Sequence, residues 1–196
     1  MPELYRVDKL WTSVTADIGE IVLKAIAQDE TRRALPDYSK DFEILEKMEW
    51  AFSKGDVSFF ETVLDRRPSL LLRIHAVCML ADMKDERAVP ALCETLKEDP
   101  SPLVRHEAAF SLGQLEFRSA VPALMGAMAN DVSVLVRHES AVALGSIGDE
   151  IARPGLIDRL QDPDEDVRLS AEVALADLDF LGDSEHEPAD DKCHHS

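Results

Sequence analysis

The chain has 196 residues with a formal net charge of −18 at pH 7, and 45% of its residues are hydrophobic although only 6% are aromatic. A field of this sign repels a phosphate backbone, so we expect no nucleic-acid binding, and a basic protein or a cationic substrate is the expected kind of partner. No apolar run approaches the roughly 20 residues that cross a bilayer, and the N-terminus lacks the apolar core of a signal peptide, so we expect a cytoplasmic protein that does not bind membranes.

The N-terminal third predicts helices that do not share a common pattern. Residues 12–30 are amphipathic, with Thr12 or Ser13 as the expected N-cap. Residues 41–55 and 56–69 predict two further helices, joined by a Gly-Asp turn. We assign residues 1–40 to an N-terminal helical extension.

From residue 73 onward the sequence repeats. Arginines stand at positions 73, 105, 137 and 168, and each is followed seven positions later by leucine and eight positions later by glycine or alanine. Prolines at 90, 122 and 154 keep the same period. These columns predict helical hairpins, in which a first helix opens near its proline and a second helix carries the arginine.

We therefore predict an all-α solenoid of helical hairpins over residues 41–181, with divergent N-terminal helices, followed by an acidic disordered tail over residues 182–196. The small residue after each leucine is expected to let neighbouring helices approach closely. The arginine column occurs in every repeat, so we expect it to be structural and to bond the link before its helix. Cys78 and Cys93 lie in apolar helical contexts and are expected to be reduced core thiols.

Two histidine–glutamate pairs, His106-Glu107 and His138-Glu139, directly follow the arginine in the two central repeats. Neighbouring helix axes lie about 8–10 Å apart, so two histidines at one level of adjacent helices can meet at one metal ion. Each glutamate is turned about 100° further around its helix and would point toward a neighbouring helix or across the groove. Histidines with a carboxylate and open positions are the ligand set of non-haem iron, and they also suit zinc or manganese.

A simpler explanation covers part of this pattern. If each helix begins directly before its pair, the helix dipole alone favours Glu107 and Glu139 in the first turn, without any ligand. It does not explain the histidines. The outer repeats carry Ile74-His75 and Leu169-Ser170 at the same positions, whereas a purely structural column would be expected in all four repeats. We expect His75 to be a packed or partly exposed helix residue rather than a ligand, and His194 and His195 to lie in a tail too flexible to form a site.

The pattern "VRxxAAxALGxIGD…AVPxLxxxL" resembles the short HEAT-like repeat of phycobilisome-lyase-type proteins over about residues 56–178. That resemblance implies that the second helix of each hairpin lines a concave face. More narrowly, "LVRHEAAFSLGQL…VLVRHESAVALGSIGD" resembles one half of deoxyhypusine hydroxylase, a di-iron monooxygenase in which four His-Glu motifs from two similar halves surround two irons. By resemblance, His106 and His138 bind one iron, and Glu107 or Glu139 reaches an iron held mainly by the opposite half.

This chain has two such motifs in its repeats rather than four, so a complete site of that kind would need a second copy of the chain. We therefore predict an iron protein, dinuclear by resemblance, whose site is completed by homodimerisation and which binds or activates O2. It could be a hydroxylase-type oxidoreductase or an O2 sensor or carrier, and the residues do not decide whether it is an enzyme. Two alternatives stay open, a metal-free scaffold for protein–protein interaction and a chaperone related to bilin lyases.

Overall fold

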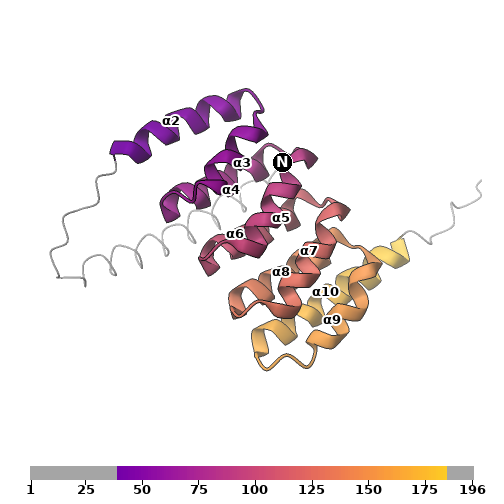
Figure 1. Ribbon diagram of the computed structural model, residues 1–196. Coiled ribbons are helices and arrows are strands. Elements are labelled where there is room, and N and C mark those ends of the chain that lie inside the picture. The colour runs from indigo at the N-terminus through magenta and orange to yellow at the C-terminus, as the bar shows by residue number, and fades with distance from the viewer. Residues whose placement is uncertain (1–38, 185–196) are drawn as a thin grey trace, which may run out of the picture. The chain divides into compact units, whose positions relative to one another are not determined.

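A computed structural model of the protein describes residues 39–184, and the predicted helix over 12–30 lies outside this range. The described part is built from α-helices and short 3₁₀ turns (Figure 1), which confirms the predicted all-α solenoid. The helices are α2 (Ser39–Ser53), α3 (Val57–Asp65), α4 (Leu70–Asp82), α5 (Val89–Glu98), α6 (Pro102–Leu115), α7 (Val121–Asn130), α8 (Val134–Ile147), α9 (Arg153–Arg159) and α10 (Glu165–Ser184). The helical body therefore runs slightly beyond the predicted limits, and residues 182–184 of the predicted tail are helical.

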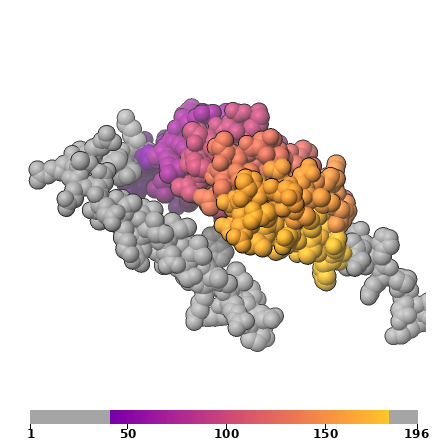
Figure 2. Space-filling model, turned by 90° about the horizontal axis from the view of Figure 1, so that it is seen from below, coloured from indigo at the N-terminus to yellow at the C-terminus, as the bar shows by residue number. Residues whose placement is uncertain are grey.

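The chain forms four consecutive hairpins, α3/α4, α5/α6, α7/α8 and α9/α10, and Figure 2 shows that they follow one another along the array in chain order. The predicted Gly-Asp turn is confirmed, because Gly55 has a φ of 62° and Asp56 caps α3 by accepting a hydrogen bond from the Phe59 N–H. A proline in the first turn opens α5, α7 and α9, as the sequence predicts. Each of these helices is preceded by a three-residue 3₁₀ turn, which the sequence analysis missed: η1 (Glu86–Ala88), η2 (Arg118–Ala120) and η3 (Glu150–Ala152).

The hydrophobic core lies between the layer of first helices and the layer of second helices. The leucine column is completely buried at Leu80, Leu112 and Leu144. Leu92 and Leu124 from the first helices are also completely buried. Burial of a leucine side chain stabilises the fold by about 1.5–3 kcal/mol, so these leucines contribute to the core of the first three hairpins, whereas Leu175 in the last hairpin is only partly buried.

The second helices α6, α8 and α10 pack against each other more extensively than the first helices do. Glycine makes this possible: a Cβ added at Gly113 would lie 2.9 Å from the Cα of Ala143, and one at Gly145 would lie 2.9 Å from the Cα of Ala174. The predicted close approach is therefore confirmed. Tighter packing in one layer places the second helices on the inner side of the array.

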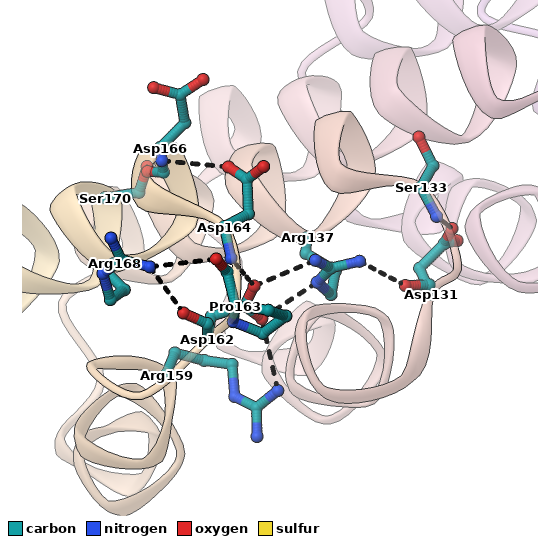
Figure 3. Close-up of polar contacts among 10 residues, drawn as sticks. All are labelled: Asp131, Ser133, Arg137, Arg159, Asp162, Pro163, Asp164, Asp166, Arg168 and Ser170. Carbon is teal, nitrogen blue, oxygen red and sulfur yellow. Dashed lines mark hydrogen bonds and ion pairs between the residues drawn. The ribbon is translucent and has the colours of Figure 1, made fainter.

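The arginine column forms a ladder of ion pairs that ties successive hairpins together. Arg137 donates Nη1 to the backbone oxygen of Asp131 in the link before its own helix, and donates Nε and Nη2 to the carboxylate of Asp162 in the next link (Figure 3). Arg105 makes the same contacts one repeat earlier, to Asp99 O and to both carboxylate oxygens of Asp131. The expected structural role of this column is confirmed. Arg73, Arg105 and Arg137 each bond two links rather than one. Arg168 bonds only the link before its own helix, through the backbone oxygens of Asp162 and Pro163.

Each aspartate of the ladder is also held by its own link. Asp131 accepts a hydrogen bond from the Ser133 N–H, and Asp162 accepts one from the Asp164 N–H. Burial acts to raise the pKa of the Asp131 carboxyl, but the hydrogen bonds and charge of Arg105 outweigh burial and hold that pKa below its usual value. The ladder therefore keeps these buried carboxylates ionised.

No helix of the described range 39–184 is both long and apolar enough to cross a membrane.

Candidate functional site

The two histidine–glutamate pairs lie in the second turn of their helices. α6 begins at Pro102 after the N-cap Ser101, and α8 begins at Val134 after the N-cap Ser133. No acidic residue stands in the first turn of either helix. The explanation of the glutamates by the helix dipole is therefore wrong, because the dipole acts mainly within the terminal turn.

His106 of α6 reaches across to Glu139 of α8. The distance from His106 Nε2 to Glu139 Oε2 is 3.2 Å, and the two side chains are 32% and 11% exposed. The hydrogen bond with Glu139 raises the pKa of His106, although burial opposes this effect. The two side chains therefore form a partly buried ion pair over a wider pH range than an exposed histidine would allow.

His138 of α8 makes the corresponding contact with α10, but with a different partner. Its Nδ1 lies 2.6 Å from the hydroxyl oxygen of Ser170. The Ser170 hydroxyl in turn donates to the backbone oxygen of Asp166, also at 2.6 Å. His138 is thus oriented by an uncharged hydroxyl, whereas His106 is oriented by a carboxylate.

Glu107 points in the other direction, toward α4. The Cys78 thiol donates a hydrogen bond to Glu107 Oε1 at 3.3 Å. Burial, together with the charge and the hydrogen bond of Glu107, raises the pKa of the Cys78 thiol to about 12. Cys78 is a free thiol, as expected, but it contacts a candidate site residue rather than only the core.

One register explains the two histidine contacts. Each histidine contacts the residue of the following helix that occupies the glutamate column, which is Glu139 for His106 and Ser170 for His138. The shared column predicts histidine beside histidine on neighbouring helices, whereas the helices are offset so that His106 lies beside Glu139. Nothing in the sequence indicates Cys78 as a contact of the site, whereas a one-residue offset between the helices points to Ser170.

The four candidate residues share the inner face of the second helices, but one chain does not gather them around a point. Within residues 39–184, no group of three or more His, Cys, Asp and Glu side chains is placed to hold a metal ion. Around the histidines this face is apolar and open, because Leu103 and Leu135 are 50% and 51% exposed. A hollow of about 240 Å³ between α6 and α8 includes Glu139 in its lining.

The His106–Glu139 contact is a suitable fragment of a metal site. Two ligand atoms each about 2.1 Å from one ion are about 3.0 Å apart at right angles and about 3.4 Å apart in a tetrahedral arrangement. The observed separation of 3.2 Å lies between these values. An imidazole nitrogen and a carboxylate oxygen also suit Fe(II), Zn(II) and Mn(II), so this pair fits a metal in its chemistry, and its spacing, which is also that of the hydrogen bond between the two groups, is compatible with two ligands of one ion.

A family model of HEAT repeats matches residues 57–115 and 89–176, which together span more than half of the chain. The chain belongs to the HEAT-repeat family. Comparison with curated proteins gave no significant match. The predicted HEAT-like resemblance is therefore confirmed at the level of the repeat.

Two solved structures are similar to this HEAT-repeat chain. Human deoxyhypusine hydroxylase in complex with glycerol is 30% identical, with a TM-score of 0.62, and the match covers 82% of this chain and 63% of that chain. The complex of CpcE and CpcF of phycocyanin lyase from Nostoc sp. PCC7120 is 24% identical, with a TM-score of 0.55, and the match covers 79% of this chain and 63% of that chain. The second likeness is one of fold alone. The chain spans about 63% of the length of both structures.

Proposed function

We propose that this HEAT-repeat protein binds iron on the inner face of α6 and α8, at a dinuclear site shared by two copies of the chain, and that it binds or activates O2 there. His106, His138, Glu107 and Glu139 are the proposed ligands. When bound, iron would supply the redox chemistry that O2 binding or activation requires. The protein side chains orient the donor atoms and provide an apolar surrounding.

The contact between His106 Nε2 and Glu139 Oε2 at 3.2 Å is the observation that carries the proposal. It joins two candidate ligands from different repeats at the spacing of neighbouring ligands on one ion. The repeat fold does not require it, because the outer repeats place isoleucine and leucine in the histidine column. The likeness to human deoxyhypusine hydroxylase supports the same chemistry, with the activity itself a proposal for this chain.

The inner face of the second helices favours a contact with a second copy of the chain. A single chain offers too few converging donors, and a two-fold axis would bring a second set of histidines and glutamates to the first. Leu103 and Leu135, each about half exposed beside a histidine, would be buried in such a contact. Because each chain carries a formal charge of −18, two copies repel each other, and cations held between them would offset that repulsion.

Metal analysis of protein loaded anaerobically with Fe(II) and then desalted tests the proposal. We expect about one iron per chain, since two copies would share two irons, together with the mass of a dimer in sedimentation. Exposure of the loaded protein to O2 should change its optical spectrum. His106→Ala and His138→Ala should each lose most of the iron while keeping the helical circular dichroism.

His75→Ala is the matched control, because it removes a histidine from the corresponding region of α4 without touching a proposed ligand. It should load iron as the wild type does. Full iron content in both His106→Ala and His138→Ala would overturn the proposed ligands. A loaded monomer would overturn the shared site and leave a mononuclear one.

The alternative function is that of a scaffold, and the exposed leucines of the inner face favour it as a second candidate. Wild-type protein that takes up no iron under anaerobic loading would support this function. The chaperone related to bilin lyases has support only from the fold shared with the CpcE–CpcF complex.

A further inference from the structure

The two histidines of the inner face are held differently, and the difference lies in which ring nitrogen contacts the next helix. His106 uses Nε2 toward a carboxylate, whereas His138 uses Nδ1 toward the hydroxyl of Ser170. A neutral imidazole carries one proton, and the nitrogen without it is the one that can bind a cation. The hydrogen bonds of Ser170 therefore determine which ring nitrogen of His138 is available to bind a cation.

Ser170 has a single hydroxyl proton, and the backbone determines where it goes. The Ser170 oxygen lies 2.6 Å from the carbonyl oxygen of Asp166, one helical turn earlier. A carbonyl oxygen cannot donate, and two oxygens at this distance need a proton between them, so the hydroxyl donates to Asp166. Ser170 is 5% exposed, which leaves little room for another rotamer.

The contact between His138 and Ser170 must then run in the opposite direction. With its proton committed to Asp166, the Ser170 oxygen can only accept, and the atom 2.6 Å away, His138 Nδ1, must be the donor. Neutral His138 is thus held as the Nδ1–H tautomer, and the lone pair lies on Nε2. An uncharged acceptor achieves this without the electrostatic stabilisation of the protonated ring that a carboxylate provides.

The geometry points to Ser170 as a positioning residue that fixes the tautomer of His138 and presents its Nε2 as the metal-binding atom, an inference that rests on the proposed iron site. Hydrogen bonds from the second nitrogen of a ligating histidine commonly set ring orientation and ligand basicity. Here the chain replaces the glutamate of its own repeat column with serine. The replacement turns a position that offers a carboxylate to the neighbouring histidine into one that offers a hydroxyl oxygen, which accepts from Nδ1–H.

Two measurements test this inference, and one of them needs no metal. Nitrogen-15 NMR of the metal-free protein reports which ring nitrogen of His138 is protonated, with His138→Gln identifying the signal. We expect Nδ1–H in the wild type and in Ser170→Thr, whose hydroxyl can make the same backbone bond. We expect Ser170→Ala to shift His138 toward the Nε2–H tautomer. Nε2–H in the wild type would overturn the inference, whatever the protein does with iron.

The second measurement is the dissociation constant for Fe(II), determined by anaerobic equilibrium dialysis. Loss of such an outer hydrogen bond typically weakens metal binding by about 10–100-fold, so Ser170→Ala should bind Fe(II) that much more weakly than Ser170→Thr and the wild type. Thr62→Ala in α3 is the control, because Thr62 also donates to a backbone oxygen one turn earlier and has no histidine partner in the inner face. It should bind as the wild type does.

The outcomes separate the inference from the proposed function. Equal Fe(II) affinity in Ser170→Ala and the wild type, with iron bound in both, would overturn the role of Ser170 and leave the iron site standing. Wild-type protein that binds no Fe(II) would overturn the iron site and with it the ligand role of Nε2. The NMR result would still decide the tautomer in that case. Circular dichroism of each variant shows whether the fold is intact.

Discussion

Replacement of Gly113 by alanine should destabilise the protein, whereas the same replacement at Gly126 should stabilise it. Both glycines lie inside helices, Gly113 in α6 and Gly126 in α7. A Cβ at Gly113 would meet the Cα and Cβ of Ala143 in α8 at 2.9 Å, whereas a Cβ at Gly126 has no neighbouring atom within 4 Å. The pair therefore isolates the effect of helix–helix approach from the effect of helix propensity.

The magnitudes follow from two opposing contributions. Alanine is favoured over glycine in a helix interior by about 0.8–1 kcal/mol, and this gain applies at both positions. At Gly113 the new methyl group meets backbone, which cannot rotate away, so α8 must move, and overpacking of this kind costs about 1–3 kcal/mol. Taking the upper part of that range, Gly113→Ala should lose about 1–2 kcal/mol of unfolding free energy. Gly126→Ala should gain about 0.8–1 kcal/mol.

Urea denaturation followed by far-ultraviolet circular dichroism measures both changes. Movement of α8 away from α6 should also lengthen the His106–Glu139 contact, now 3.2 Å, so Gly113→Ala should bind Fe(II) more weakly while Gly126→Ala binds normally. Gly113→Ala that is as stable as the wild type would refute the reasoning from close approach. A loss of stability in Gly126→Ala would refute the reasoning from propensity.

Three further predictions concern charge and protonation. Asp131→Asn should lower the free energy of unfolding by about 3 kcal/mol near neutral pH, because Arg105 keeps its charge in a nearly buried position without its carboxylate. The pKa of Asp131 in the folded protein lies below its usual value, so this stabilisation is present above the unfolded pKa of about 3.9 and is lost as the pH falls through the folded pKa. In urea denaturation at a series of pH values, the free energies of unfolding of Asp131→Asn and the wild type should therefore converge in acid. The hydrogen bond with Glu139 raises the pKa of His106 above 6.5. The contribution of protonated His106 to the free energy of unfolding is therefore fully present below pH 6.5 and is lost as the pH rises through the raised pKa. NMR titration of His106 should show the raised pKa in the wild type and a lower pKa in Glu139→Gln. Because the pKa of Cys78 is about 12, iodoacetamide should modify it slowly in the folded protein and quickly in urea, as peptide mapping by mass spectrometry would reveal.

The fold is predictable from the sequence because each of its determinants is local and repeated. Proline near a helix start, leucine every 31 or 32 residues and glycine after leucine each act within one hairpin or between neighbours. The 3₁₀ turns before α5, α7 and α9 were missed because short turns of this kind have no apolar period. In two of the three, an aspartate accepts a bond from the N–H two residues on, Asp85 from Arg87 and Asp149 from Ile151.

The sequence singles out the four candidate residues but does not predict how they are arranged. The sequence identifies His106, Glu107, His138 and Glu139 as unusual, because the outer repeats lack the pair. It does not reveal how far one helix slides along the next, and that offset decides whether histidine faces histidine or glutamate. The start of α6 at Pro102, rather than beside His106, is by contrast a local feature, because proline is favoured at the first helical position.

The offset is fixed by residues that take no part in the proposed chemistry. Arg105 bonds the link before α6 and the link before α8, and so sets the position of one helix along the other. Gly113 sets their separation through its contact with Ala143. Once both are fixed, His106 in the histidine column of α6 lies beside Glu139 in the glutamate column of α8, and His138 lies beside Ser170 in the same way. The scaffold therefore determines where two side chains meet and leaves their identity free. Side chains that could bind a ligand can be present at that point, or absent as in the outer repeats, without altering the packing that holds the array together.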